Sequence, residues 1–273
     1  MRKEPQFFIF TYHKVGTILM SKLLRDVTHR LGMSLGIVSG FAPDLKLDAD
    51  IVIFVHSLIG FDLADCNCRG VRLFRDPRDL WVSGYLYHRR CREHWCTNTC
   101  FDTSPPITFP RVPKSQQHRP EVWKRNYLDS LGGKSYQQNL LELGRSEGLA
   151  FELDRYAGWT IESMCAWRPN PSILDLRMEW LSTRYDSLMN TLFHQMGLRG
   201  ERHATAMGIA TQHDIARMSD AEIAADDHIY SRTLSKWRGF LQANDLALYD
   251  SRFAGASARF EYADQRLEAT IGL

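Results

Sequence analysis

The sequence predicts an α/β protein with a central parallel sheet flanked by helices. Apolar stretches typical of strands alternate with amphipathic stretches typical of helices through the first ninety residues. The stretch over 51–55 is continuously apolar, as in strands buried on both faces of a parallel sheet. With 273 residues, of which 44% are hydrophobic, the chain can bury one substantial core, and we expect a single domain over 1–273.

The expected elements alternate along the chain. We expect strands over 6–12, near 34–38, over 51–55, 71–74 and 172–176, and helices over 17–31, 77–90, 135–147, 151–167 and 182–196. The helix over 17–31 is expected to bury the apolar residues that recur at helical spacing, namely Leu19, Leu23, Leu24, Val27 and Leu31. Asp76 and Pro77 are typical of an N-cap and a first helical residue, so they mark the start of the helix over 77–90.

The first strand runs into a short turn that carries Lys14, Gly16 and Thr17. A strand, a tight turn and a helix direct several backbone N–H groups and the positive helix end at one point, where Lys14 adds a full charge. The lysine precedes the glycine, so the turn departs from the pattern of nucleotide triphosphatases. It suits one terminal phosphate or phosphosulfate group. An ordinary strand-to-helix turn with an exposed lysine is the alternative.

A second anion site is predicted where the strand over 71–74 meets the next helix. Arg75 lies at the strand end beside the helix N-terminus, and Ser83 follows in the second turn of that helix. The arginine fork and the serine hydroxyl are both suited to one phosphate group. Two such sites at two strand ends favour a ligand with two separated phosphate groups.

These two segments resemble the nucleotide-binding motifs of the sulfotransferase family. Tyr-His-Lys-Val-Gly-Thr over 12–17 resembles the family's 5′-phosphosulfate loop, Tyr-Pro-Lys-Ser-Gly-Thr-Thr, and the run from Arg75 to Ser83 resembles its 3′-phosphate motif. The resemblance implies a P-loop-like sulfotransferase architecture, 3′-phosphoadenylyl sulfate (PAPS) as donor, adenosine 3′,5′-bisphosphate (PAP) as product, and no metal. The nucleotide-binding residues that it implies are Lys14, Val15, Gly16, Thr17, Ile18, Arg75, Ser83 and Arg232.

The first motif departs from the family at four positions. His13 replaces the usual proline, Val15 the serine, Ile18 the second threonine, and Leu19 the tryptophan that stacks on adenine in cytosolic members. These changes remove hydroxyl contacts to the 5′-phosphate. Backbone amides, Lys14 and Thr17 would therefore carry more of the binding.

The strand over 51–55 delivers His56 to the same carboxyl edge of the sheet as the two anion sites. His56 resembles the family's general base, which follows a Lys-Thr pair, although Phe54 stands here where lysine is common. The alternative is a partly buried strand-end histidine that is satisfied by backbone groups.

The resemblance implies an enzyme, a sulfotransferase acting on a hydroxyl or amine of a small-molecule, lipid or carbohydrate acceptor. His56 would take the acceptor proton, and Lys14 would stabilise the leaving phosphate. Two other functions stay open. A P-loop-like small-molecule kinase would need an acidic magnesium ligand at a strand end, and a non-catalytic nucleotide-binding protein on the same fold would not need His56. The sequence identifies neither the acceptor nor the oligomeric state.

The basic segment over 230–238 resembles the family's C-terminal phosphate-binding stretch. It ends in Trp237 and Arg238, which match a Trp-Lys pair of the family, and the family's glycines are absent. Arg232 is the predicted phosphate contact in this segment. A solvated arginine is the alternative.

The region from about 91 to 134 is predicted to be a long irregular loop that covers the acceptor. Five of the ten prolines lie between Pro105 and Pro120, among aromatic side chains. A mobile surface insertion is the alternative. The spacing of Cys91, Cys96 and Cys100 does not fit a zinc site, although metal or disulfides stay open for these cysteines.

Charge and hydropathy limit the partners. The net charge of +2 argues against general nucleic-acid binding, and the chain contains no run of about 18 apolar residues that could span a membrane. The first strand begins after five residues, which leaves no room for a signal peptide. We therefore expect a cytoplasmic protein.

Overall fold

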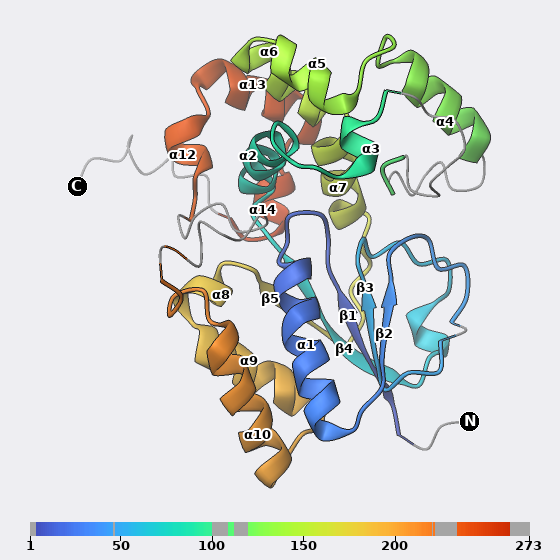
Figure 1. The fold of residues 1–273 in the computed structure, drawn as a ribbon, viewed down its shortest axis with the longest axis vertical. Helices are drawn as coiled ribbons and strands as arrows, with labels where there is room; N and C mark the ends of the chain where they lie inside the picture. The colour runs from blue at the N-terminus through green and yellow to red at the C-terminus, as the bar shows by residue number, and fades with distance from the viewer. Residues whose placement is uncertain are drawn as a thin grey trace. The chain divides into compact units, whose positions relative to one another are not determined.

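The computed structural model comprises two units, and a parallel sheet forms the centre of the first (Figure 1). The structure describes residues 4–45, 47–99, 109–111, 120–219, 221 and 234–262. The first unit comprises Met1–Phe74, Arg111–Pro120 and Trp167–Thr233, and the second comprises Arg75–Pro110, Glu121–Ala166 and Leu234–Leu273. The single domain expected over 1–273 stays a prediction.

The sheet has five strands, all parallel, in the order β2-β3-β1-β4-β5. The strands are β1 (Gln6–Phe10), β2 (Leu35–Val38), β3 (Ile51–Phe54), β4 (Cys68–Phe74) and β5 (Ile173–Arg177). This arrangement confirms the predicted fold class. Phe10 at the end of β1 pairs in register with Phe54 at the end of β3, so the turns that follow these two strands leave the sheet at the same level.

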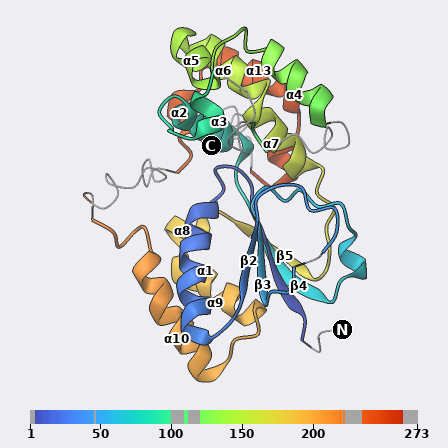
Figure 2. The same cartoon turned by 45° about the vertical axis from the view of Figure 1, so that its right-hand side comes forward.

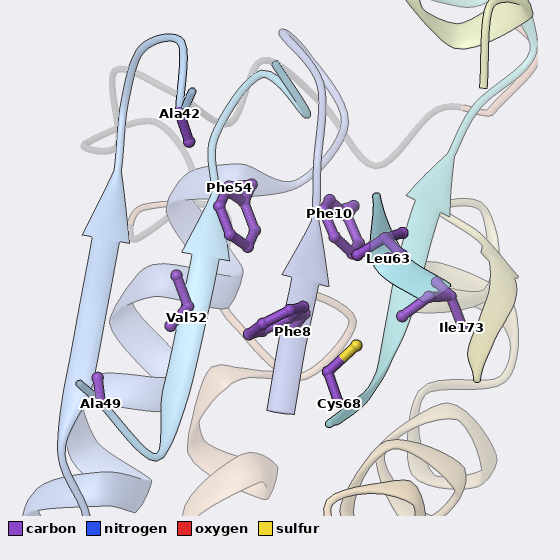
Figure 3. Packing of buried hydrophobic residues seen from close by; sticks show 9 residues of the cluster. All are labelled: Phe8, Phe10, Ala42, Ala49, Val52, Phe54, Leu63, Cys68 and Ile173. Atoms are coloured by element: carbon purple, nitrogen blue, oxygen red, sulfur yellow. The ribbon is translucent and has the colours of Figure 1, made fainter. Parts of the chain in front are cut away.

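Helices cover one face of the sheet, namely α1 (Thr17–Leu31), α9 (Tyr185–Gln195) and α10 (Gly200–Ala210) (Figures 1 and 2). Helix α1 spans the predicted 17–31, and it buries Leu23, Leu24 and Val27 completely, whereas Leu19 and Leu31, also expected in the core, are half-buried. The opposite face carries a cluster of buried apolar side chains around Phe8, Phe10 and Phe54 (Figure 3). The rings of Phe10 and Phe54 stack with centroids 5.0 Å apart, which ties the ends of β1 and β3 together.

The second unit is helical, and α2 (Pro77–His88) lies at its centre, packed against the helices α5, α6, α7, α12 and α14. These are α5 (Tyr136–Glu142), α6 (Arg145–Leu153), α7 (Tyr156–Cys165), α12 (Trp237–Phe240) and α14 (Ala256–Arg259), joined by α3 (His94–Thr97), α4 (Pro120–Asp129) and α13 (Ala243–Phe253). The buried indole of Trp81 donates a hydrogen bond of 2.9 Å to the carbonyl of Leu149, which fixes α2 against α6.

Three sequence predictions are wrong in this unit. The helix expected over 151–167 is divided between two helices, since α6 ends at Leu153 and α7 begins at Tyr156. The irregular loop expected over 91–134 contains α3 and α4, because Pro120 occupies the start of a helix, where a proline is favoured. The helix expected over 135–147 ends at Glu142, since Gly144 caps a new helix and its N–H is bonded by the Glu147 carboxylate at 3.2 Å.

None of the helices within these described ranges is long and apolar enough to cross a membrane.

Candidate functional site

The turn between β1 and α1 has a left-handed backbone at two of its residues. Lys14 has φ 60° and Gly16 has φ 71°. The N–H of Val15 donates to the carbonyl of Tyr12 at 3.1 Å, and the Val15 side chain is fully buried. A Cβ on Gly16 would lie 3.1 Å from Leu181 Cδ1, so the glycine meets both a conformational and a packing requirement.

The left-handed conformation of Lys14 is costly for a residue with a side chain. Such a residue loses on the order of 1 kcal/mol and persists only where the surrounding structure imposes it. Here the buried Val15 and the left-handed Gly16 follow directly and constrain the turn. Backbone strain of this kind is concentrated at binding and catalytic sites, which supports the predicted role of this turn.

The hydroxyl of Thr17 is directed into the protein. Thr17 Oγ1 lies 2.9 Å from Thr11 Oγ1 and 3.2 Å from the carbonyl oxygen of Tyr12, and both can accept its single proton. Thr17 is also the first residue of α1, and Ile18 follows with 39% of its surface exposed. The N–H groups in the first turn of a helix have no partner within the helix, so they are the donors that an anion would meet here.

His56 follows the end of β3 and is almost completely buried, with 8% of its surface exposed. Its Nδ1 atom has no hydrogen-bond partner in the part of the chain that the structure describes. Burial, together with the charge of Arg111, lowers the pKa of His56 to about 4. The imidazole is therefore neutral near pH 7, with a ring nitrogen left for a ligand.

Arg111 is a functional candidate that the sequence analysis missed. It lies in the region predicted to be an irregular loop, and its guanidinium donates to the carbonyl and the hydroxyl oxygen of Ser39. These bonds hold a cation close enough to His56 to act on its pKa. No local sequence signal marks this arginine, because its relation to His56 depends on how the chain returns to the sheet.

Arg75 and Ser83 belong to the second unit, at the start of α2 and along it. The Arg75 side chain is 7% exposed, and its Nη2 lies 3.6 Å from Asp79 Oδ2. Ser83 is half-buried. Asp76 caps the helix as predicted, because its Oδ1 accepts the N–H of Arg78 at 2.9 Å. The Arg78 guanidinium is also paired with Asp76, through bonds of 3.0 and 2.9 Å.

Lys236 is a second functional candidate that the sequence analysis missed. Burial and the charges of Arg75 and Arg90 lower the pKa of Lys236 to about 8, although Asp79 acts in the opposite direction. The lysine lies within the basic segment predicted to bind phosphate, where Arg232 was the named contact. Arg232 lies outside the described residues, whereas Lys236 lies near Arg75 and Arg90, which precede and follow α2.

The cysteines add no ligand set to the site. Cys91 and Cys96 are buried and form no disulfide, while Cys100 is not among the residues that the structure describes. Within the described ranges, no three His, Cys, Asp or Glu side chains lie together as they would to hold a metal ion.

The predicted residues thus fall into two sets, each placed within its own unit. The first unit holds Lys14 and its turn together with His56 on the next strand end. The second unit holds Arg75 and Ser83, to which the structure adds Lys236.

The fold is that of the sulfotransferases. The crystal structure of mouse sulfotransferase SULT7A1 complexed with PAP matches this chain with a TM-score of 0.50, at 12% sequence identity, over 98% of this chain and 90% of that chain. No protein-family model matches the sequence, and no curated protein matches it. At this identity the likeness establishes the fold, and the chemistry of the site is argued from its residues.

Proposed function

We propose that the protein transfers a sulfuryl group from PAPS to a hydroxyl or amine of a small-molecule, lipid or carbohydrate acceptor. The observation that carries the proposal is the pairing of two turns on neighbouring strand ends, one with the strained Lys14 and one with the neutral, buried His56. The fold is shared with a sulfotransferase that was crystallised with PAP, which supports the same donor.

His56 is the proposed general base. When an acceptor oxygen or nitrogen attacks the sulfur, its proton must leave, and a neutral imidazole nitrogen can accept it. Burial, together with the charge of Arg111, lowers the pKa of His56 to about 4, so the ring is in its neutral, proton-accepting form at any pH well above 4. Nδ1 has no partner among the residues that the structure describes, and this supports a role for the ring beyond packing, because native proteins rarely leave a buried ring nitrogen without a partner.

Lys14 is the proposed stabiliser of the leaving group. Negative charge builds on the bridging oxygen as the bond to sulfur breaks, and the Lys14 ammonium would neutralise it together with the first N–H groups of α1. Val15 has its side chain in the core and its N–H bonded to Tyr12, so its proposed contribution is to shape the turn. Gly16 permits the close approach of a ligand to the backbone.

Arg75, Ser83 and Lys236 are the proposed contacts of the second phosphate group. The positive charges of Arg75 and Arg90 repel that of Lys236, whereas the carboxylate of Asp79, 3.6 Å from Arg75, attracts it. An anion would relieve that repulsion.

Ligand binding and transfer test the proposal separately. PAP should raise the unfolding temperature without magnesium, whereas a kinase would require magnesium to bind ATP. A panel of phenols, alcohols, amines and sugars incubated with ³⁵S-labelled PAPS should then yield a labelled product. We expect Lys14→Ala and His56→Ala to abolish that product. Failure of PAP to stabilise the protein would overturn the proposed donor, and PAP binding without any transfer would favour the non-catalytic alternative.

A further inference from the structure

The turns that carry Lys14 and His56 are joined through one residue, Thr11. Thr11 is fully buried at the end of β1, and its N–H donates to the carbonyl of Phe54 at 3.0 Å. Its hydroxyl donates to the carbonyl of Val55 at 3.1 Å. Its carbonyl oxygen accepts the hydroxyl of Ser57 at 2.8 Å. Every polar group of Thr11 thus contacts the segment that leads into and out of His56.

Thr11 also receives a hydrogen bond from the other turn. Its hydroxyl oxygen lies 2.9 Å from the hydroxyl of Thr17, which begins α1 directly after the Lys14 turn. With the hydroxyl proton of Thr11 donated to the Val55 carbonyl, Thr17 is the donor in this pair, and the Thr11 hydroxyl is the nearer of the two acceptors of the Thr17 proton. The result is a directed chain of hydrogen bonds from Thr17 through Thr11 to Val55.

The segment over 55–57, which contains His56, has a strained backbone like that of the Lys14 turn. Ser57 has φ 54°, a left-handed conformation that a serine adopts at a cost. Its hydroxyl bond to the Thr11 carbonyl is buried and holds the backbone on one side of His56. The Val55 carbonyl bond to Thr11 holds the backbone on the other side.

We propose that Thr11 is a positioning residue of the transfer site, which fixes the His56 turn relative to the Lys14 turn through its hydroxyl and its carbonyl. The inference rests on the proposed function. The inference also changes the expected role of the Thr17 side chain. A phosphate oxygen can only accept a hydrogen bond, and the one hydroxyl proton of Thr17 is already donated within the protein. Thr17 would then contact an anion through its backbone N–H, while its hydroxyl helps to hold the bridge.

Thr11→Val and Thr11→Ser test the bridge as a matched pair. Valine keeps the branched shape and removes the hydroxyl, whereas serine keeps the hydroxyl. Thr28→Val is the control, because Thr28 is a buried threonine of the same unit. Its hydroxyl donates to carbonyls of its own helix, at 2.6 Å from Leu24 and 3.1 Å from Arg25. Ser57→Ala removes the second bond of the bridge by a different change.

The first readout is the pH titration of His56 in ligand-free protein, which is monitored through the NMR signals of its imidazole ring. Loosening the turn should admit water and move the His56 pKa from about 4 back toward the ordinary value of 6.5 in Thr11→Val and Ser57→Ala. Thr11→Ser and Thr28→Val should titrate as the wild type does. An unchanged His56 titration in Thr11→Val and Ser57→Ala would overturn the bridge.

The second readout is transfer from labelled PAPS to an acceptor found by the panel. We expect Thr11→Val to lower kcat about tenfold, the equivalent of one hydrogen bond, with the Kd for PAP changed less than about twofold. Serine should restore most of the rate. Equal losses in kcat and PAP affinity, or no loss in either, would contradict a positioning role. Absence of transfer by the wild-type protein would instead overturn the proposed function, and the His56 titration would still decide on the bridge.

Discussion

The main-chain N–H of Trp237 donates a hydrogen bond of 3.0 Å to Oδ1 of Asp79. The contact joins residues 158 positions apart and attaches the C-terminal segment to α2. The Arg78 guanidinium carbon lies over the Trp237 ring, 3.8 Å from its centroid, and this contact also holds the segment against α2. Because Lys236 precedes Trp237, the bond holds that lysine where the charges of Arg75 and Arg90 act on it.

Lys236→Met should weaken PAP binding and stabilise the ligand-free protein. The substitution removes a cation that burial and the neighbouring arginines disfavour, so the folded state loses a repulsion when no anion is bound. Thermal unfolding with and without PAP measures both effects. Lys134→Met is the matched control, since Lys134 is an exposed lysine of the same unit paired with Glu142. A Lys236→Met protein that binds PAP as tightly as the wild type would remove Lys236 from the site.

PAP affinity should fall as the pH rises through about 8, the pKa of Lys236 in the free protein. Above that pH the lysine is neutral and no longer attracts a phosphate group, whereas a lysine with the ordinary pKa of 10.5 would stay charged. Calorimetric titrations with PAP at several pH values between about 7 and 9.5 measure the trend. The same series with Lys236→Met should be flatter, and a parallel decline in both proteins would assign the effect to another group.

The rate of transfer should depend little on pH on the acid side of neutrality. The profile of kcat/KM reports the pKa of the base in the free enzyme, and the His56 pKa is lowered to about 4. We therefore expect kcat/KM to stay level from about pH 7 to about pH 5 and to decline as the pH approaches 4. A decline centred near 6.5 would mean that an ordinary histidine acts as the base.

The stability of the protein should decline in the same acid range. The folded-state pKa of His56 is below its unfolded value of 6.5, so the unfolded chain binds the additional proton. The stability from the neutral ring is fully present above 6.5 and is lost as the pH falls toward 4, by about 3 kcal/mol in total. Urea unfolding of wild type and His56→Gln should show a smaller pH dependence in the variant. His213→Gln, at a surface pair with Asp26, is the control.

Arg75→Ala should mainly weaken the binding of PAP, while Lys14→Ala should abolish transfer. Arg75 is a proposed contact of the second phosphate group, which takes no part in bond breaking, whereas Lys14 would face the oxygen on which charge builds. Steady-state kinetics over a range of PAPS concentrations separates the two. If Arg75→Ala lowered kcat and left KM unchanged, the proposed division of roles would be wrong.

The strands and the first turn could be predicted because their signals are local. The apolar run before Lys14, the glycine after it and the start of α1 all lie within one short stretch, and the structure confirms the strand and the helix start. The lowered pKa of His56 could not be predicted, since it depends first on the burial of the ring in the folded protein and then on Arg111, far along the chain. Lys236 also required the tertiary bond between Trp237 and Asp79. Pro120 misled the prediction of α4 because proline occurs both in loops and at the first position of a helix.

The left-handed backbone at Lys14 and Ser57 has a consequence for anyone who would engineer this protein. Glycine adopts that conformation without strain, so Lys14→Gly is a change that a screen for heat resistance would tend to enrich, whereas Ser57→Gly would relieve strain but lose the buried bond to the Thr11 carbonyl. Each would remove a group that the proposed chemistry or the Thr11 bridge requires. Variants recovered from such a screen should therefore be more stable but inactive. Their sequences would show which residues are retained for activity although they destabilise the fold.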